Sequence, residues 1–384
     1  MRKRKTCLKA IVIVQQAYQV TSISNYQFID AIGRGGFGKV WKVKKKKNTL
    51  FYALKVMSKA KIILKKSVQS VLNERQLLSN LRNGFMINMQ CAFQDKEYLY
   101  LVMDLLTGGD LRFHIGRLRR FNEEQTKFFA ACIIIALEYL HQNGILHRDL
   151  KPENLVFDSS GYLRLTDLGI ARIWKPENSS DTSGTPGYMA PEVMCRQNHG
   201  IGVDYFALGV IVYECMLGRR PYLGRSRQEI REQMLSKQAA IKRQEIPPGW
   251  DIQAGDFANQ QLLQRKPQNR LGSNGPEEVK EHPWFKDFDW EKLENKRILA
   301  PFIPNCNQDN YLPSDGINDS DDSLSAEQHL MLRRNSIQNL FNGYDQDGNQ
   351  QQCSQNNLMI FSSQSSARSS KPPTLSSTLK SSKL

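Results

Sequence analysis

Two short polar segments constrain this chain more than any other feature of its sequence. The first reads His147-Arg148-Asp149-Leu150-Lys151-Pro152-Glu153-Asn154, and the second, Asp167-Leu168-Gly169, begins eighteen residues after Asp149. Their carboxylate and amide oxygens are the hard ligands that Mg²⁺ prefers. A fold that uses both segments must bring Asp149 and Asp167 to one cavity. A loop cap and an ordinary turn residue are the simpler interpretations of these two aspartates.

The residue types in these segments match the needs of phosphoryl transfer. That reaction requires a metal held across phosphates, neutralised charge on the moving group and an acceptor hydroxyl oriented in line. Asp149 can orient the hydroxyl and accept its proton, and Lys151 can offset charge on the moving phosphoryl group. Asn154 and Asp167 can hold Mg²⁺. Thr185 is expected to contact both Asp149 and Lys151.

A glycine-rich stretch near the N-terminal end has the context of a β-hairpin. It reads Gly33-x-Gly35-x-x-Gly38-x-Val40 and lies between residues that favour strands. Hairpin glycines let backbone amides approach phosphates, whereas a dinucleotide site places its glycines at a helix N-terminus. A turn that needs positive φ is the alternative interpretation. Lys55, on the next predicted strand, can bridge two phosphates, and Glu74 has the charge to pair with it.

The hydrophobic pattern predicts an α+β fold with a small β lobe followed by a larger, mainly helical lobe. Two antiparallel strand pairs are expected, at 18–43 with 50–56 and at 89–93 with 98–103. Helices are expected at 67–81, at 123–141 and, buried because of its low polarity, at 205–217.

A later segment, Gly184-Thr185-Pro186-Gly187-Tyr188-Met189-Ala190-Pro191-Glu192, is expected to order the substrate. A buried Glu192 would need a cation, and Arg270 is the predicted partner. Asp204 precedes the buried helix and is expected to accept hydrogen bonds from the loop that carries Asp149.

These residues resemble the signature set of the eukaryotic protein kinase fold, over about Tyr26 to Trp284. Within that fold the chain resembles the AGC group, through Ser183-Gly184-Thr185-Pro186, His282-Pro283-Trp284-Phe285, Asp289-Trp290 and Ala300-Pro301-Phe302-Ile303-Pro304-Asn305. Met103-Asp104-Leu105-Leu106-Thr107-Gly108-Gly109-Asp110-Leu111-Arg112, with Gly218-Arg219-Arg220-Pro221-Tyr222, resembles the YANK subfamily. The resemblance implies a bilobal serine/threonine protein kinase that uses ATP and Mg²⁺.

The resemblance also implies where nucleotide and substrate bind. Adenine is expected between Val40 and Ala53 above and Val156 below, with backbone hydrogen bonds near Asp104 and Leu106 and with Met103 as gatekeeper. The implied nucleotide-binding residues are Ile32, Gly33, Arg34, Gly35, Gly36, Phe37, Gly38, Val40, Ala53, Lys55, Glu74, Met103, Asp104, Leu106, Asp110 and Val156. Acidic residues imply basic protein substrates, with arginines before the phosphorylated residue, and these are Asp110, Glu153 and Glu214.

The chain departs from the family pattern in several places. Leu168 replaces the usual Phe after the metal-binding aspartate, and Tyr205-Phe206 replaces a pair of tryptophans, both apolar exchanges that should preserve activity. Asp181 stands where relatives carry an activating phosphothreonine and is expected to pair with Arg148. Phe341-Asn342-Gly343-Tyr344-Asp345 resembles the hydrophobic motif that AGC kinases dock on the small lobe, and an ordinary apolar pair in a loop is the alternative.

The predicted organisation has four parts. They are a basic N-terminal extension (1–25), a kinase domain (26–285, with a small lobe at 26–105 and a large lobe at 106–285), an AGC-type C-terminal extension (286–345) and a Ser-rich tail (346–384). Residues 354–384 contain no Asp or Glu and are predicted to be disordered.

The formal net charge of +15 and the cysteine pattern bear on partners and location. The basic clusters at 2–5, 42–47 and 59–66 lack interleaved aromatics, which favours solvated faces over nucleic-acid binding. No apolar run approaches the roughly 18 residues of a membrane span. Seven scattered cysteines indicate reduced thiols, so a cytoplasmic location is expected, with the peroxisomal address Ser382-Lys383-Leu384 as the alternative. The protein is also expected to be a monomer.

Two other functional classes remain open on the sequence. A pseudokinase scaffold would keep the fold and bind partners without transferring phosphate, but intact Lys55, Asp149, Asn154 and Asp167 argue against it. A small-molecule kinase on a related fold is the second alternative. The segment at 184–192, which suits an extended peptide, argues against that class.

Overall fold

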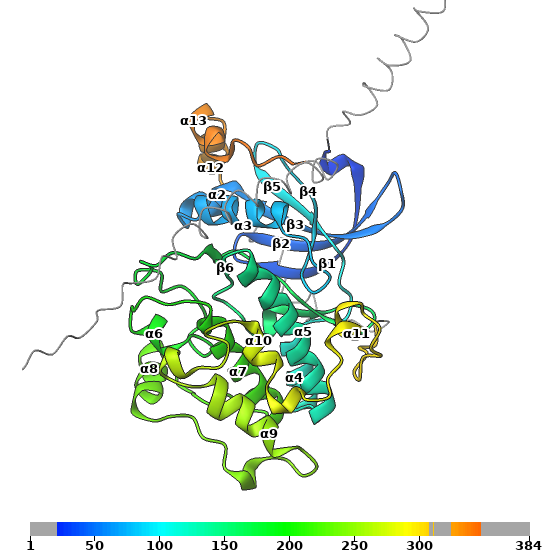
Figure 1. The fold of residues 1–384 in the computed structure, drawn as a ribbon. Helices are drawn as coiled ribbons and strands as arrows, with labels where there is room; N and C mark the ends of the chain where they lie inside the picture. Colours follow the sequence, from blue (N-terminus) through cyan, green and yellow to red (C-terminus); the bar gives the residue numbers. More distant parts are fainter. Residues whose placement is uncertain (1–20, 307–309, 311–323, 347–384) are drawn as a thin grey trace, which may run out of the picture.

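The computed structural model describes residues 21–306, 310 and 324–346. Most of the predicted N-terminal extension, the Ser-rich tail beyond residue 346 and the tripeptide Ser382-Lys383-Leu384 lie outside the described residues. The described residues form two lobes, with a small antiparallel sheet and its helices above a larger helical lobe (Figure 1). The α+β, bilobal architecture predicted from the sequence is therefore confirmed.

The small lobe is built on a five-stranded sheet with the order β1-β2-β3-β5-β4, in which all neighbours are antiparallel. Its strands are β1 (Tyr26–Gly35), β2 (Gly38–Lys45), β3 (Phe51–Ser58), β4 (Met89–Gln94) and β5 (Tyr98–Met103). Its helices are α2 (Lys59–Leu64) and α3 (Val68–Asn80). Helix α3 lies within one residue of its prediction at each end, because Val71, Leu77 and Leu78 face the core.

Helix α2 was not predicted, since its sequence reads as part of a basic cluster. It begins after Ser58, whose hydroxyl accepts a hydrogen bond from the Lys61 N–H at 3.4 Å. The solvated-face interpretation of this cluster is wrong for Lys59, which is fully buried. The Lys59 Nζ donates to the Asp95 carbonyl at 2.7 Å and to Gln338 at 2.8 Å. The paired hydrogen bonds explain how an ammonium group is tolerated in the interior.

The large lobe packs around two long buried helices, α5 (Glu123–Gln142) and α7 (Gly202–Leu217). Its other helices are α4 (Leu111–Leu118), α6 (Pro191–Met194), α8 (Arg227–Ser236), α9 (Ile252–Gly255) with a π-helical segment at Asp256–Leu262, α10 (Pro276–Lys280) and α11 (Trp290–Glu294). Its short strands pair as β6 (Ile145–Leu146) with β9 (Arg172–Ile173) and β7 (Leu155–Phe157) with β8 (Leu163–Leu165).

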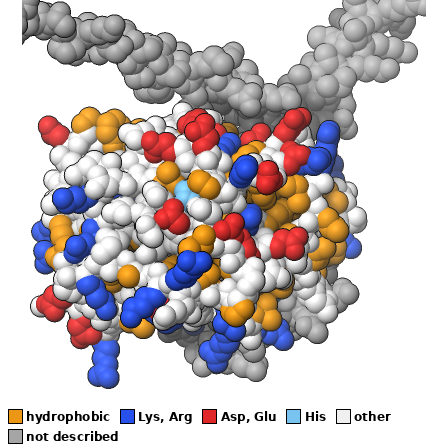
Figure 2. All heavy atoms as spheres, turned by 60° about the horizontal axis from the view of Figure 1, so that its bottom comes forward, with side chains coloured by type: hydrophobic (Ala, Val, Ile, Leu, Met, Phe, Trp, Pro, Cys, Tyr) orange, Lys and Arg blue, Asp and Glu red, His pale blue; other side chains and the backbone are white. Residues whose placement is uncertain are grey.

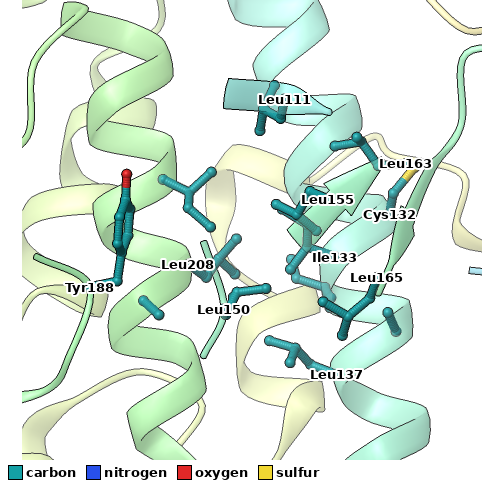
Figure 3. Packing of buried hydrophobic residues seen from close by; sticks show 14 of the residues in the cluster. Leu111, Cys132, Ile133, Leu137, Leu150, Leu155, Leu163, Leu165, Tyr188 and Leu208 are labelled. Atoms are coloured by element: carbon teal, nitrogen blue, oxygen red, sulfur yellow. The ribbon is translucent and has the colours of Figure 1, made fainter. Parts of the chain in front are cut away.

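The core of this lobe reaches directly into the loop that carries the predicted site. Figure 3 shows Leu150 among apolar side chains of α5, α7, β7 and β8, which include Ile133, Leu208, Leu155 and Leu165. Leu150 lies between Asp149 and Lys151 in the chain and is almost completely buried. Its packing fixes the backbone from which the two polar neighbours project.

A buried ion pair joins two distant segments of the large lobe. Arg270 donates to both carboxylate oxygens of Glu192, at 2.6 and 3.0 Å, and its guanidinium lies 5.0 Å from the centre of the Phe206 ring. The predicted pairing of Glu192 with Arg270 is confirmed. Removal of either partner would leave an unpaired buried charge, which costs about 3–5 kcal/mol in comparable pairs.

The C-terminal segment returns to the small lobe. Helices α12 (Ala326–Leu332) and α13 (Asn335–Gln338) lie against the small lobe, with α12 in contact with α2 (Figure 1). The side chains of Phe341 and Tyr344 are fully buried, and the Lys59 ammonium lies 5.1 Å from the centre of the Phe341 ring. The expected docking of the motif at 341–345 is therefore confirmed.

Hydrogen bonds fix the end of this segment to the small lobe. Arg75 on α3 donates to the carbonyls of Tyr344 and Asp345, both at 2.8 Å. The Asp345 carboxylate accepts from the backbone and side-chain amides of Gln94, at 3.2 and 2.8 Å. Gln346 forms an antiparallel bridge with Ala92 and so adds to the edge strand β4.

The surface charges and the helices bear on nucleic-acid binding and on membrane spans, which were considered in the sequence analysis. On the face in Figure 2, which brings the lower end of Figure 1 forward, acidic and basic side chains are interspersed. Within residues 21–306, 310 and 324–346, no helix has both the length and the apolarity to cross a membrane.

Substitution of Phe341 by Ala should destabilise the protein, because it leaves a cavity under the docked segment. The expected loss is about 3 kcal/mol, or a fall in Tm of roughly 5 °C or more. Thermal denaturation followed by circular dichroism measures it. Leu340→Ala is the matched control, since that neighbouring side chain is 44% exposed and its loss should change Tm little. Equal Tm values for the two variants would contradict the packing described here.

Candidate active site

The glycine-rich stretch forms the hairpin between β1 and β2. Gly35 pairs with Gly38 at its end, and Gly33 pairs with Val40 further along the strands. A Cβ atom on Gly38 would lie 2.0 Å from the carbonyl oxygen of Val56 on β3, so only glycine fits there. The predicted strand-turn-strand context is confirmed.

The tip of this hairpin is attached to the start and end of α2. The Phe37 carbonyl accepts from the Ser58 N–H at 3.0 Å, and the Gly36 carbonyl accepts from the Lys65 Nζ at 2.6 Å. The Lys65 ammonium also lies 5.6 Å from the centre of the Phe37 ring. Because carbonyl groups at the tip are bound to α2, the position of the hairpin is set by the helix that follows β3.

Lys55 on β3 and Glu74 on α3 form a close ion pair, with 2.7 Å between Nζ and Oε1. Burial acts to lower the pKa of Lys55, but the carboxylates of Glu74 and Asp167 outweigh it and raise the pKa above its ordinary value. Lys55 therefore stays charged at neutral pH. The predicted pairing is confirmed, and it also places Asp167 within electrostatic reach of this lysine.

Asp167 adopts the left-handed backbone region, with φ of 60°, which non-glycine residues seldom occupy. Its carboxylate accepts a hydrogen bond from the Gly169 N–H at 3.0 Å. Burial acts to raise the pKa of Asp167, but Lys55 and this hydrogen bond lower it below the ordinary value, so the carboxylate is ionised. Leu168, the exchange noted in the sequence, is fully buried and turns away from the polar site into the core.

The loop around Asp149 brings together four of the predicted residues, Asp149 itself, Lys151, Asn154 and Thr185. The Lys151 Nζ donates to Asp149 Oδ2 at 2.6 Å and to the Thr185 hydroxyl oxygen at 3.0 Å. The Thr185 hydroxyl and backbone N–H donate to Asp149 Oδ1, at 2.7 and 3.0 Å. The Asn154 side-chain N–H₂ donates to the Asp149 carbonyl at 2.9 Å. The expected contacts of Thr185 with Asp149 and Lys151 are thus observed.

Backbone contacts join Asp167 to this loop. The N–H of Thr166, directly before Asp167, donates to the Asn154 carbonyl at 2.9 Å, and the Asn154 side chain in turn binds the Asp149 carbonyl. Asp167 therefore begins its segment one residue away from the loop that carries Asp149.

One buried carboxylate supports this loop from below. Asp204 at the start of α7 accepts from the backbone N–H groups of His147 and Arg148, at 3.0 and 2.8 Å, as predicted. It also lies 2.9 Å from Nε2 of His141. These bonds hold Arg148 at φ of 67°, directly before Asp149. Burial acts to raise the pKa of Asp204, but the hydrogen bonds, led by that of His141, lower it.

The segment that joins the lobes follows β5. Ala53 on β3 pairs with Met103 on β5, while Leu106 beyond it is buried. The backbone N–H of Asp104 donates to the Asn88 carbonyl at 3.1 Å. The N–H of Asp104 is thus already bound within the chain, and the expected backbone hydrogen bonds to adenine near Asp104 and Leu106 stay a prediction.

The three acidic residues assigned to substrate binding also lie together. Asp110 caps α4, where its carboxylate accepts from the Phe113 N–H at 2.7 Å, and its backbone forms a bridge with Val156. Glu153 and Glu214 both bind the side chain of Arg112, at 2.9 and 2.8 Å. The role of Arg112 was missed, although it stands two residues after Asp110.

Asp181 lies 3.1 Å from the Arg148 guanidinium, so the pairing expected at the phosphothreonine position is confirmed. Arg148 also donates to the Ile170 carbonyl at 2.9 Å. The Arg148 side chain thus connects Asp181 to the segment that follows Gly169. The backbone of Arg148 belongs to the loop of Asp149, so Asp181 is connected to that loop as well.

The fold has two lobes, and the polar residues predicted for the site come from both of them. The chain belongs to the protein kinase family, because a family model described as Protein kinase domain matches residues 26–285.

Several curated proteins are similar to the chain. Protein kinase 2 of Dictyostelium discoideum is 38% identical over 294 residues, which is 76% of this chain and 60% of that protein. Serine/threonine-protein kinase Sgk2 of Homo sapiens is 38% identical over 286 residues, which is 73% of this chain and 76% of that protein. The RAC family serine/threonine-protein kinase homolog of D. discoideum is 34% identical over 286 residues, 74% of this chain and 63% of that protein.

The chain spans about three fifths of the length of several of these relatives. The relatives agree with the resemblance to the AGC group. The closer resemblance to the YANK subfamily stays a prediction.

Substitution of Asp204 by Asn should destabilise the protein by about 3 kcal/mol at neutral pH, because an amide N–H₂ then faces a backbone N–H. The lowered pKa of Asp204 adds stability that is present above its ordinary value of 3.8 and is lost as the pH falls through the folded value. The Tm difference from wild type should therefore be constant near neutrality and shrink in acid.

Thermal denaturation across a pH series measures this difference. Asp287→Asn, at an exposed position, is the control and should match the wild type. A difference that grows in acid would contradict the assigned charge state.

Proposed function

We propose that this protein is a serine/threonine protein kinase that transfers the γ-phosphoryl group of ATP to protein hydroxyls. The observation that carries the proposal is the convergence of Lys151 and Thr185 on the Asp149 carboxylate, together with the ion pair of Lys55 and Glu74. Relatives named serine/threonine-protein kinases support the choice of acceptor. A scaffold without activity would not need this set of charged contacts.

The residues present suit Mg²⁺ bound together with phosphates. The described part of the chain contains no cluster of three or more His, Cys, Asp or Glu side chains that could hold a metal alone. Mg²⁺ in nucleotide sites instead uses one or two protein oxygens plus phosphates and water. Asn154 and Asp167 would supply those oxygens, since the Asn154 nitrogen is already bound to the Asp149 carbonyl. When bound, Mg²⁺ neutralises charge on the β- and γ-phosphates.

The remaining steps are assigned to side chains of the two lobes. Lys55, fixed by Glu74, binds phosphate oxygens, and the backbone amides of the hairpin at 33–38 cover the phosphates. Asp149 accepts the proton of the acceptor hydroxyl, while Thr185 and Lys151 hold its carboxylate in one orientation. Lys151 also offsets negative charge that develops on the transferred group.

Asp149→Asn tests this assignment, because the amide cannot accept the proton. Transfer from Mg²⁺-ATP to a serine peptide should fall about 10²–10⁴-fold, while binding of a fluorescent ATP analogue stays the same. Asp287→Asn is the control. A wild-type chain that binds nucleotide but transfers no phosphate would establish the scaffold instead, and an unchanged rate for Asp149→Asn would remove the assigned base.

We also propose that Asp181 replaces an activating phosphate. A carboxylate carries less charge than phosphate, and Asp181 is 46% exposed, so its pairing with Arg148 contributes about 1 kcal/mol or less. Asp181→Ala should therefore lower kcat/KM by roughly fivefold or less.

Peptide kinetics after phosphatase treatment measure this effect. Asp181→Glu should retain most activity, and Thr182→Ala should match the wild type. Loss of wild-type activity on phosphatase treatment would show that Asp181 does not suffice.

The proposed substrates are basic protein segments. The support is the set of acidic side chains near the N-terminal end of α4, Asp110, Glu153 and Glu214, of which Glu214 already has both carboxylate oxygens bound to Arg112. Opposite charges at that place would select substrates by complementarity.

The proposed setting is a monomer in the cytoplasm. Its support is the set of buried cysteines at 91, 132 and 215, which are not in disulfides in the described part of the chain, since such thiols suit a reducing compartment. A fluorescent fusion that leaves Leu384 free distinguishes this setting from the peroxisome, which the terminal tripeptide offers as the alternative.

A further inference from the structure

Arg112 makes an unusually complete set of contacts with two acidic residues. Its Nη1 and Nη2 donate to Oε1 and Oε2 of Glu214, at 2.8 and 3.0 Å. Its Nε donates to Oε1 of Glu153 at 2.9 Å. Its Nη2 also contacts the Tyr188 hydroxyl, which in turn donates to Glu214 Oε2 at 2.6 Å. Both oxygens of Glu214 are therefore in use within the chain.

The arrangement has the geometry with which a carboxylate recognises an arginine. Two parallel N–H···O bonds to one carboxylate form the strongest and most specific guanidinium contact. The Glu214 side chain is only 7% exposed, whereas Arg112 is 32% exposed and Glu153 is 44% exposed. The partly exposed guanidinium thus covers a carboxylate that is itself buried.

The stability of α4 does not explain an arginine at this position. Arg112 is the second residue of α4, where a positive charge interacts unfavourably with the helix dipole. The first turn of α4 is already capped by Asp110. The contacts that hold Arg112 lead away from its own helix, to η2 (Pro152–Asn154) and α7.

We propose that Arg112 is a specificity residue that occupies, from within the chain, the place where a substrate arginine would bind Glu214. The inference rests on the proposed kinase function and narrows it. Glu214 contributes no selection for arginine, and basic substrate residues are recognised by Asp110 and by Glu153, of which Arg112 binds only Oε1. One fewer arginine is therefore recognised than the three acidic residues alone would suggest.

The test compares the wild type with Arg112→Ala in the full chain. Each is assayed with serine peptides that carry either Arg or Ala at each position before the serine, and kcat/KM is measured for every peptide. Arg112→Ala should raise the preference for Arg over Ala roughly tenfold or more at one position, mainly through KM, because a charged hydrogen-bonded pair becomes available. Arg117→Ala, an exposed arginine on the same helix, should keep the wild-type preference.

Two further measurements separate specificity from a purely structural role. The double variant Arg112→Ala/Glu214→Gln should lose the gained preference, since the amide cannot replace the carboxylate. Methylguanidinium added to Arg112→Ala should suppress the gain competitively by filling the same place. Arg112→Lys, which keeps one charge but not the paired contact, should gain a smaller preference and serves if Arg112→Ala does not fold.

The outcomes are distinct. An unchanged Arg-to-Ala ratio in both Arg112 variants, with peptide phosphorylation intact, would overturn the inference. A wild-type chain without transfer to any peptide would overturn the proposed function instead.

Discussion

The buried carboxylate of Asp204 is the interaction on which the rest of the site depends. A loop with Arg148 in the left-handed region is unfavourable alone, and it persists because two backbone N–H groups end on one charged acceptor in the core. Asp204 lies on α7, whose residues are nearly all buried. The loop is therefore hydrogen-bonded to a helix that is fixed in the core. The polar residues on this loop, Asp149 and Lys151, are then held within hydrogen-bonding distance of each other although neither is part of the apolar core.

Sequence reasoning succeeded where the constraint is local or where charge must be balanced. The strands of the small lobe follow from strand-forming residues between turns, α3 from its stripe of apolar residues, and α5 and α7 from their low polarity. The pairs Lys55 with Glu74, Glu192 with Arg270 and Arg148 with Asp181 could be predicted because an ionised side chain held near the interior requires a partner of opposite sign. Each of these predictions needed only the type of residue and its place in a known order of segments.

The sequence could not reveal where several groups compete for one partner. Glu153 and Glu214 each have the charge to bind a substrate, and only the three-dimensional contacts show that Arg112 reaches both. Lys59 presents the same difficulty, since a lysine in a basic cluster reads as solvated until the C-terminal segment covers it. Helix α2 was not predicted for a related reason, because its burial depends on residues more than two hundred positions away.

Helix α3 carries Glu74 and Arg75 side by side, and the two point to different tasks. Glu74 binds the lysine assigned to the phosphates, and Arg75 binds two carbonyls of the docked C-terminal segment. Because the same rigid helix makes both contacts, the proposed binding of nucleotide and the docking of the C-terminal segment are thermodynamically coupled. Linkage between binding sites is reciprocal, so any increase in nucleotide affinity that the docked segment confers is matched by an equal increase in the affinity of the segment for the small lobe.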